Sequence, residues 1–367
     1  MSTAVKRIPS LDGMRAVSIA LVIVSHYCRE VNWGDPLGLG LLGVRVFFII
    51  SGYLITGLLL KELQRDGHIS LLRFYFRRTM RIFPAFYFYL ACMLLISTLG
   101  WASLSFREAL PALTYTSNYF GPSIHGLIRH TWSLAAEEQF YLIWPAALAL
   151  SGRRRGLFVL LALLVLAPLS GHFLGQYFGH SVPAFFNGPI GIGCLFAMTQ
   201  EYLHKREVYR RWVHSTAGLL LPLVILVSSL AVLHTGGLRD ELSSVIANIS
   251  IALWLDWAMA NSKSLFGRLL NNPAVVYIGV LSYSIYLWQQ PFLGKTDALN
   301  LSGDWKLLLN PFVQLPAIAV CAVLSYYLVE RPMLRLRARI EPKWFANKDH
   351  STKPGGRVTP EIRRAEA

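Results

Sequence analysis

The fold class follows from residues 14–32, which read MRAVSIALVIVSHYCREVN. A run of about 20 mostly apolar residues is what an α-helix needs to cross the roughly 30 Å hydrocarbon core of a bilayer. The whole 367-residue chain has this character, since 54% of its residues are hydrophobic and only 15% are charged. An average soluble domain carries about 25% charged residues. The sequence therefore predicts an integral membrane protein and excludes a soluble enzyme, a secreted mini-protein and a nucleic-acid-binding protein.

Similar apolar runs recur along the chain. We expect membrane-spanning helices at 14–32, 41–61, 82–100, 131–150, 156–172, 184–200, 215–234, 243–260, 274–293 and 309–330. The first of these is not a cleaved signal peptide, because it continues through His26 to Arg29 without a small-residue cleavage site. The prediction is an all-α integral membrane protein, a bundle of about ten transmembrane helices.

Lysine and arginine are distributed unequally between the two sides of this bundle. Of the 35 such residues, 27 fall in one set of connections and at the two termini, five fall on the opposite side, and three lie within spans. Cytoplasmic connections carry the excess of positive charge, so we expect both termini in the cytoplasm and a multi-pass protein of the inner membrane. Residues 1–340 are predicted to form the transmembrane domain. Residues 341–367 are predicted to form a basic, disordered cytoplasmic tail, with no second globular domain.

The four cysteines give no sign of a disulfide framework or a metal site. Cys28, Cys92, Cys194 and Cys321 all lie inside apolar runs, without a Cys-x-x-Cys pair or any paired spacing. We therefore expect no metal.

Ionisable residues inside spans are energetically costly, so each is a candidate functional residue. Arg15 and His26 are eleven residues apart, close to three helical turns, which places them on one helix face about 16 Å apart along the axis. Glu137 is expected at a depth similar to that of His26, where a carboxylate could orient the imidazole and stabilise its protonated form.

Other interpretations of these residues remain open. His26 could hydrogen-bond a neighbouring backbone group. Glu137 and Glu138 point about 100° apart, so only one of them can face a given site, and the other could pair with Arg129 or with lipid headgroups. Asp256, flanked by tryptophans, could have a structural or interfacial role.

Arg78 and Arg81 lie three residues apart, so they are neighbours on one face of a helix just below the third span. Such a face could clamp phosphate groups. It could equally anchor the protein to anionic lipids on the cytoplasmic side.

Six segments together resemble the membrane acyltransferase type 3 family. They are IPSLDGMRAVSIALVIVSH (8–26), GVRVFFIISGYLIT (43–56), RRTMRIFP (77–84), HTWSLAAEEQFYLIWP (130–145), IGVLSYSIYLWQQP (278–291) and YYLVERP (326–332). They occur in the family's order across nearly the whole chain. Two positions depart from the family pattern: Gln289 stands where relatives often have histidine, and Arg45 where they commonly have aspartate.

The resemblance implies O-acyl transfer, commonly of acetyl from acetyl-CoA, to a hydroxyl of a carbohydrate or glycolipid. It implies that His26 is the general base, that Glu137 is the family's glutamate in the fourth span, and that Arg15, Arg78 and Arg81 bind the donor at the cytoplasmic mouth. The expected partners are acyl-CoA, the acceptor and membrane lipids, without nucleic acid. One alternative function is a proton-coupled transporter or exporter that uses the same intramembrane residues, although the chain lacks an internal repeat. Another is a non-catalytic membrane sensor or scaffold, which would not need Arg15, His26 and Glu137 on facing helices.

Overall fold

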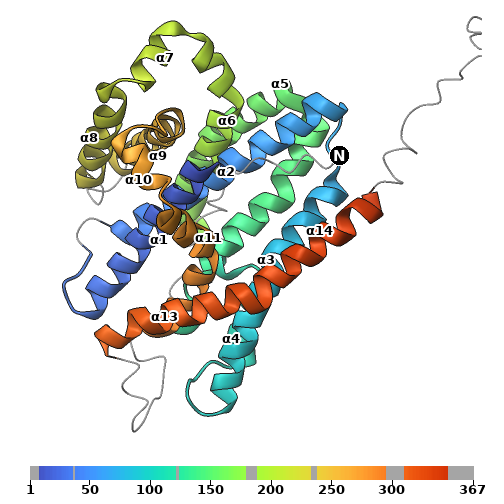
Figure 1. Cartoon of the computed structure of the whole chain (residues 1–367), viewed down its shortest axis with the longest axis vertical. Helices are drawn as coiled ribbons and strands as arrows, with labels where there is room; N and C mark the ends of the chain where they lie inside the picture. Colours follow the sequence, from blue (N-terminus) through green and yellow to red (C-terminus); the bar gives the residue numbers. More distant parts are fainter. Residues whose placement is uncertain are drawn as a thin grey trace, which may run out of the picture.

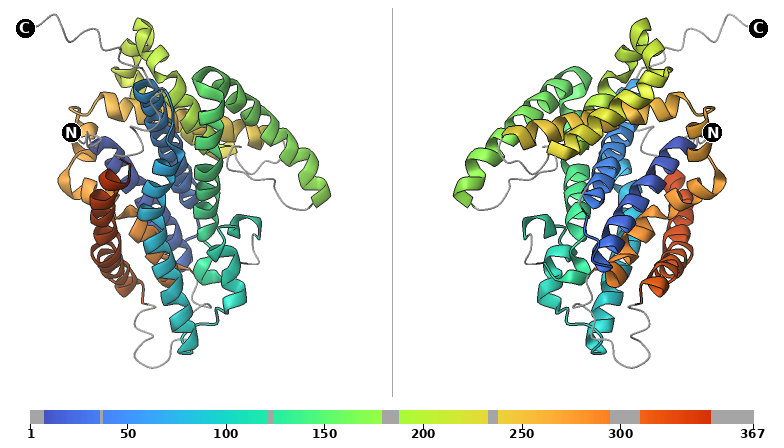
Figure 2. Two further views of the ribbon diagram at one scale, coloured as in Figure 1. Left: turned by 90° about the vertical axis from the view of Figure 1, so that its right-hand side faces the viewer. Right: turned by 90° about the vertical axis from the view of Figure 1, so that its left-hand side faces the viewer.

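The computed structural model describes residues 8–35, 38–120, 124–178, 188–232, 238–294 and 310–345. Throughout these ranges the regular elements are helices, most of them packed side by side along one direction (Figures 1 and 2). The α-helices are α1 (Pro9–Glu30), α2 (Leu39–Asp66), α3 (Leu71–Thr98), α4 (Phe106–Leu113), α5 (Thr131–Phe178), α6 (Pro189–Lys205), α7 (Glu207–Val213), α8 (Thr216–Val232), α9 (Leu238–Ala260), α10 (Leu265–Leu270), α11 (Pro273–Trp288), α12 (Gln290–Leu293), α13 (Pro311–Ser325) and α14 (Arg331–Phe345). Two 3₁₀ turns, Ser117–Tyr119 and Gly126–Ile128, precede α5, and a π-helical turn, Tyr326–Glu330, joins α13 to α14. The predicted all-α fold is confirmed.

Helix length and composition give fewer candidate spans than the ten apolar runs. Among the described residues, five helices are long and apolar enough to cross a bilayer, namely Pro9–Glu30, Leu39–Asp66, Leu71–Thr98, Leu242–Ala260 and Pro311–Phe345. A sixth is possible if α7 and α8, bent by 77° where they meet, form one broken span. Helices do occur at each of the ten expected places, but α6 and α11 have only 17 and 16 residues. The protein is therefore an integral membrane protein with five to six candidate spans by these criteria.

Two helix boundaries differ from the sequence-based expectation. The expected spans 131–150 and 156–172 are merged in α5, which is interrupted at Gly152, where φ is +67°. Helix α14 continues to Phe345, inside the stretch expected to be a disordered tail. Residues 184–187, 233–234 and 309 of the expected spans, and the tail from residue 346, lie outside the described residues.

Helix α1 is held between α2 and α11 by glycines. A Cβ atom on Gly43 of α2 would lie 2.6 Å from the carbonyl oxygen of Ser18. A Cβ atom on Gly279 of α11 would lie 1.8 Å from the carbonyl oxygen of Asp12. Small residues let membrane helices approach closely, because attraction between helices in lipid depends on close packing. Two glycines thus fix α1, which carries Arg15 and His26, against its neighbours on two faces.

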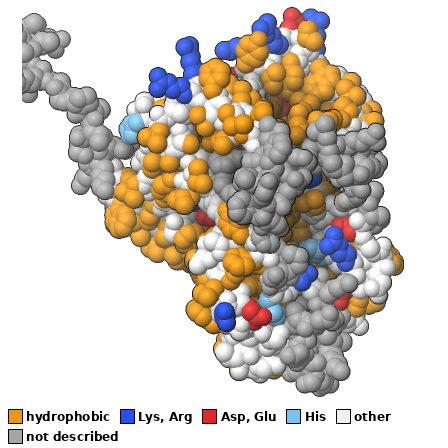
Figure 3. Space-filling model, turned by 180° about the vertical axis from the view of Figure 1, so that it is seen from behind, with side chains coloured by type: hydrophobic (Ala, Val, Ile, Leu, Met, Phe, Trp, Pro, Cys, Tyr) orange, Lys and Arg blue, Asp and Glu red, His pale blue; other side chains and the backbone are white. Residues whose placement is uncertain are grey.

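The outer surface has the character expected of a lipid-facing one. Large apolar side chains such as Leu142, Leu150, Phe158 and Phe312 are exposed. On the described part of the face in Figure 3, hydrophobic side chains cover large areas, and Lys and Arg side chains lie along the upper edge with a few more in the lower half. Large exposed apolar areas bordered by cationic side chains are typical of a protein that is surrounded by lipid.

Candidate active site

The five predicted site residues come from three helices. Arg15 and His26 lie on α1, Arg78 and Arg81 on α3, and Glu137 on α5. Within the part of the chain that the structure describes, no hydrogen bond or ion pair joins His26 to Glu137. The two lie in separate polar groups, which are described in turn.

The imidazole of His26 is held by an amide. Its Nδ1 atom lies 2.6 Å from Oε1 of Gln289, which is fully buried at the end of α11. Gln289 in turn uses Nε2 to donate to Oε1 of Gln290 at 3.4 Å, and Nε2 of Gln290 donates to the carbonyl oxygen of Gly126 at 2.9 Å. A chain of hydrogen bonds thus runs from a backbone carbonyl to the imidazole.

This chain determines which nitrogen of His26 carries a hydrogen. The carbonyl oxygen of Gly126 can only accept, so the NH₂ group of Gln290 must face it, and each amide along the chain is oriented in turn. Gln289 therefore presents its oxygen to His26, and Nδ1 must donate. In the neutral imidazole Nε2 is then an acceptor with a free lone pair. Among the described residues, no side chain hydrogen-bonds Nε2. An imidazole oriented through one nitrogen and unoccupied at the other is the arrangement of a general base.

Glu137 belongs to the second polar group. Its Oε1 atom accepts hydrogen bonds from the hydroxyls of Ser51 on α2 and Tyr141 one turn further along α5. Its charge also interacts with the guanidinium groups of Arg15 and Arg78. The expectation that Glu137 orients His26 is therefore wrong for this structure, in which Gln289 is the partner of His26.

Arg15 and Arg78, two arginines of the predicted donor site, each lie close enough to the third, Arg81, for their charges to interact. The guanidinium of Arg78 lies 5.0 Å from the centre of the Tyr141 ring and 5.7 Å from that of Phe74, so aromatic faces hold it. Arg15 is 3.8 Å from Asp12, one turn earlier on α1. Arg81 is exposed. The structure brings these three cations together, with the last of them open to an anionic ligand.

Further basic residues reach this region from α14, and sequence reasoning missed them. Glu341 on α14 accepts from Arg73 at 3.0 Å and forms an ion pair with Arg77, both on α3. Arg337, on the preceding turn of α14, is close enough to interact with Arg81. The alternating arginines at 335, 337 and 339 are the signal in the sequence for this contact, although hydropathy and charge counts give them no individual role.

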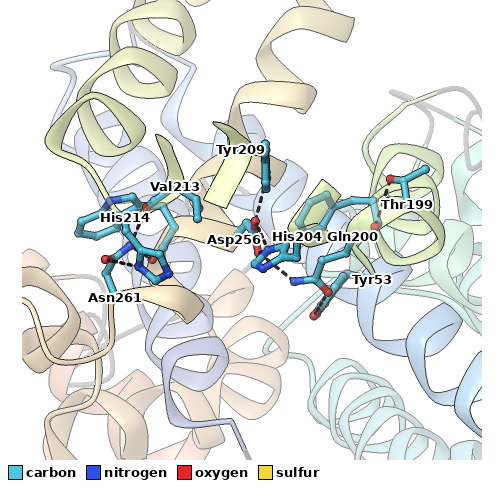
Figure 4. A network of polar contacts seen from close by, with 11 residues as sticks. Tyr53, Thr199, Gln200, His204, Tyr209, Val213, His214, Asp256 and Asn261 are labelled. Carbon is cyan, nitrogen blue, oxygen red and sulfur yellow. Dashed lines mark hydrogen bonds and ion pairs between the residues drawn. The ribbon is translucent and has the colours of Figure 1, made fainter. Parts of the chain in front are cut away.

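Asp256 lies in a separate polar network (Figure 4). Its carboxylate accepts from Nε2 of His204 at 2.8 Å, from the hydroxyl of Tyr209 at 2.8 Å and from Nε2 of Gln200 at 2.8 Å. Gln200 also accepts from Tyr53 of α2 at 2.9 Å. The network ties α2, α6, α7 and α9 together, which favours the structural interpretation of Asp256.

The fold and these two polar groups define a class of protein, and comparison with known proteins agrees. The family profile described as an acyltransferase domain matches residues 8–331, so the chain belongs to the acyltransferase 3 family. The chain is 31% identical over 359 residues to the O-acetyltransferase OatA of Staphylococcus aureus, a match that covers 89% of this chain. It is 29% identical over 371 residues to YrhL of Bacillus subtilis, whose assignment as a peptidoglycan O-acetyltransferase is provisional.

These relatives are longer proteins. The match covers 57% of OatA and 55% of YrhL, so the chain spans little more than half the length of each. No solved structure gives a significant match to the chain.

Proposed function

We propose that this protein is a membrane-bound O-acyltransferase that moves an acyl group from cytoplasmic acyl-CoA to a hydroxyl of a carbohydrate or glycolipid. The observation that carries the proposal is the imidazole of His26, which is held through Nδ1 and to whose Nε2 no described residue hydrogen-bonds. The names of the relatives make acetyl the first acyl group to test. They also make a peptidoglycan sugar the first acceptor to test.

The donor is expected to bind at the arginines. CoA carries several phosphates, which cannot enter hydrocarbon, and guanidinium groups bind phosphate through charge-assisted hydrogen bonds. Arg15, Arg78 and Arg81 are the proposed phosphate-binding residues. Arg15 and His26 lie on one continuous helix, about 16 Å apart along its axis. An extended pantetheine arm bridges much of that distance and brings the thioester towards His26.

His26 is the proposed general base. Its Nε2 takes the proton of the acceptor hydroxyl as the hydroxyl oxygen bonds to the thioester carbonyl carbon. The C–S bond then breaks, and the proton passes from His26 to the departing CoA thiolate. General base catalysis of this kind contributes about 10²–10⁴ to the rate. Glu137 is proposed to act at the donor end, where its negative charge offsets part of the positive charge of Arg15 and Arg78.

The proposed orientation rests on the charge distribution. With 27 of 35 lysines and arginines on one side, both termini and the arginine cluster face the cytoplasm, where acyl-CoA is found. His26, about 16 Å from Arg15 along the helix, then lies in the half of the bilayer from which an extracytoplasmic glycan arrives. We also propose that the protein lies in the inner (cytoplasmic) membrane, with up to ten helical segments crossing or entering it.

The test is acyl transfer by the purified chain in nanodiscs, supplied with radiolabelled acetyl-CoA and peptidoglycan fragments. Wild type should release CoA and label the glycan, and His26→Ala should lower kcat by about 10²–10⁴ while the protein still inserts and folds. His68→Ala, a substitution at an exposed histidine in the α2–α3 connection, is the matched control and should keep wild-type activity. Near-normal transfer by His26→Ala would remove this residue from the mechanism. A wild-type protein that neither releases CoA nor labels glycan would overturn the proposed function.

A further inference from the structure

His130 is a second buried histidine near the proposed base. It directly precedes α5 and is only 4% exposed. Its ring packs edge-on against Tyr89 and Tyr286, with ring centres 5.5 and 5.4 Å apart. Neither Nδ1 nor Nε2 has a hydrogen-bond partner among the described residues. The site described above makes no use of this imidazole.

Two unpartnered ring nitrogens are costly in such a position. A buried polar atom without a hydrogen bond costs about 1–3 kcal/mol, so nearly all such atoms in proteins are paired. A phenylalanine would fill the same aromatic surroundings without that cost. The indole Nε1 of Trp288, whose ring also packs edge-on against Tyr89, is another buried donor without a described partner. Two side chains that pack on Tyr89 thus carry buried polar atoms without a described partner, which indicates a place where a polar ligand completes the hydrogen bonding.

His130 is also near His26. The two imidazoles are close enough to interact electrostatically. A hydrogen-bond chain also connects the two histidines. Gln290, the last amide of the chain that holds His26, donates to the carbonyl oxygen of Gly126, in the turn just before His130. Two imidazolium ions side by side would repel each other. When His26 takes a proton, His130 therefore stays neutral, and a neutral imidazole offers one N–H donor.

We propose that the N–H of His130 donates a hydrogen bond to the carbonyl oxygen of the acyl group during transfer. This inference rests on the proposed acyltransferase function. As the acceptor oxygen bonds to the carbonyl carbon and His26 takes its proton, the C=O electron pair moves onto oxygen, which receives the hydrogen bond from His130. When the C=O bond re-forms, the C–S bond breaks and His26 returns the proton to the thiolate. The start of α5 at Thr131 adds the positive end of a helix dipole next to this oxygen.

The experiment measures kcat, binding of CoA and thermal stability for His130→Phe, His130→Asn and His130→Gln in nanodiscs. Phenylalanine keeps the ring and removes the donor, so kcat should fall by about 10²–10³, as it does when an oxyanion donor is lost. The dissociation constant for CoA should stay within about twofold, and the unfolding temperature should not fall, because an unpaired polar group has been removed. Asparagine and glutamine place an N–H near the positions of Nδ1 and Nε2. One of these two variants should therefore have a kcat at least tenfold higher than that of His130→Phe.

The control is Tyr115→Phe, which also removes a buried, unpartnered polar atom but in the aromatic stack with Phe83 and Phe86. It should keep wild-type kcat. Wild-type kcat in His130→Phe, or a loss that neither Asn nor Gln recovers, would assign His130 to packing alone. If wild type itself does not transfer acetyl, the proposed function fails. If wild type is active, His26→Ala is inactive and His130→Phe is fully active, only the role of His130 fails.

Discussion

At the scale of single residues, the proposed base is oriented by an amide where a carboxylate is the commoner partner of a catalytic histidine. A carboxylate would stabilise the imidazolium by charge, whereas the Oε1 atom of Gln289 supplies only a hydrogen bond. The tautomer of His26 is nevertheless defined, because the hydrogen-bond chain through Gln290 ends at a backbone carbonyl that cannot donate. At this site the imidazole of His26 is thus oriented by a hydrogen bond to a neutral group, and its hydrogen-bond partner carries no negative charge.

Gln289 is accordingly predicted to be a positioning residue. Gln289→Leu removes the acceptor for Nδ1, leaves the ring free to rotate and should lower kcat by about 10–100-fold, as the loss of an outer hydrogen-bond partner of a histidine does in other sites. Gln289→Glu keeps the acceptor and adds charge, so it should retain much more activity than the leucine variant. Steady-state kinetics with acetyl-CoA tests both. Equal activity of Gln289→Leu and wild type would show that the ring needs no such partner.

The sequence supplied the candidate site residues but not the way in which the structure groups them. Hydropathy places a residue at a depth in the membrane, and His26 does lie on a helix that is long and apolar enough to span it, whereas α5, which carries Glu137, is not among the described candidate spans. Depth says nothing about position in the plane of the membrane, and there Glu137 turns towards Ser51 and Arg78. The partner of His26, 263 positions away in the chain, could not be found from local spacing. Gln289 stood out in the sequence only as a departure from a family pattern.

At the scale of elements, the turn between α1 and α2 is organised by one carboxylate. Asp35 accepts from the backbone N–H groups of Leu39 at 2.8 Å and Gly40 at 3.4 Å, which are otherwise unpaired at the start of α2. It also accepts from Ser25 at 2.6 Å and from Arg29 at 3.1 Å. Asp35 therefore caps one helix and ties it to the end of the other, one turn from His26.

The pKa of Asp35 gives this cap a defined pH dependence. Partial burial acts to raise the pKa, but the hydrogen bonds from Ser25, Leu39 and Gly40 and the charge of Arg29 outweigh it, so the pKa lies below its usual value. A lowered pKa in the folded state contributes stability above the unfolded-state pKa of about 3.9, and that stability is lost as pH falls through the folded-state pKa.

Asp35→Ala should therefore destabilise the protein at pH 7 by about 0.5–2 kcal/mol, the range for loss of a helix cap. The difference from wild type should shrink as pH falls below about 4, because Asp35 then takes up a proton in the unfolded state before it does so in the folded state. Unfolding in detergent at pH 7 and at pH 3.5 measures this. A difference that stays constant with pH would mean that the charge of Asp35 has no part in the cap.

Hydropathy located the helices well but not their ends. Each expected apolar run coincides with a helix, because a bilayer forces apolar segments to satisfy their backbone hydrogen bonds internally. The ends depend on contacts that hydropathy does not register. Helix α14 continues into the polar C-terminal region because Glu341 pairs with arginines of α3, and the bend between α7 and α8 is accompanied by the hydrogen bond from Tyr209 to Asp256.

At the scale of the whole molecule, the charge distribution predicts which connections face each side of the membrane. In a variant without its native cysteines, His68→Cys in the α2–α3 connection should react with an impermeant maleimide only after the membrane is opened. Ser103→Cys, in the exposed segment after α3, should react in intact cells whose outer layers are permeable to the reagent. The two sites flank one helix, so each serves as the control for the other. The reverse labelling pattern would mean that the protein has the opposite orientation, with the arginine cluster on the side of the membrane away from acyl-CoA.

The glycine contacts on two faces of α1 have a consequence for which donors can react. Arg15 and His26 lie on one continuous helix, so their separation is fixed, and Gly43 and Gly279 hold the backbone of that helix directly against α2 and α11. In the proposed mechanism, a thioester reacts only when its phosphates bind at Arg15 while its carbonyl carbon reaches His26. A thioester carried on a much shorter arm, such as one of N-acetylcysteamine, would not reach from Arg15 to His26, even with the same acyl group.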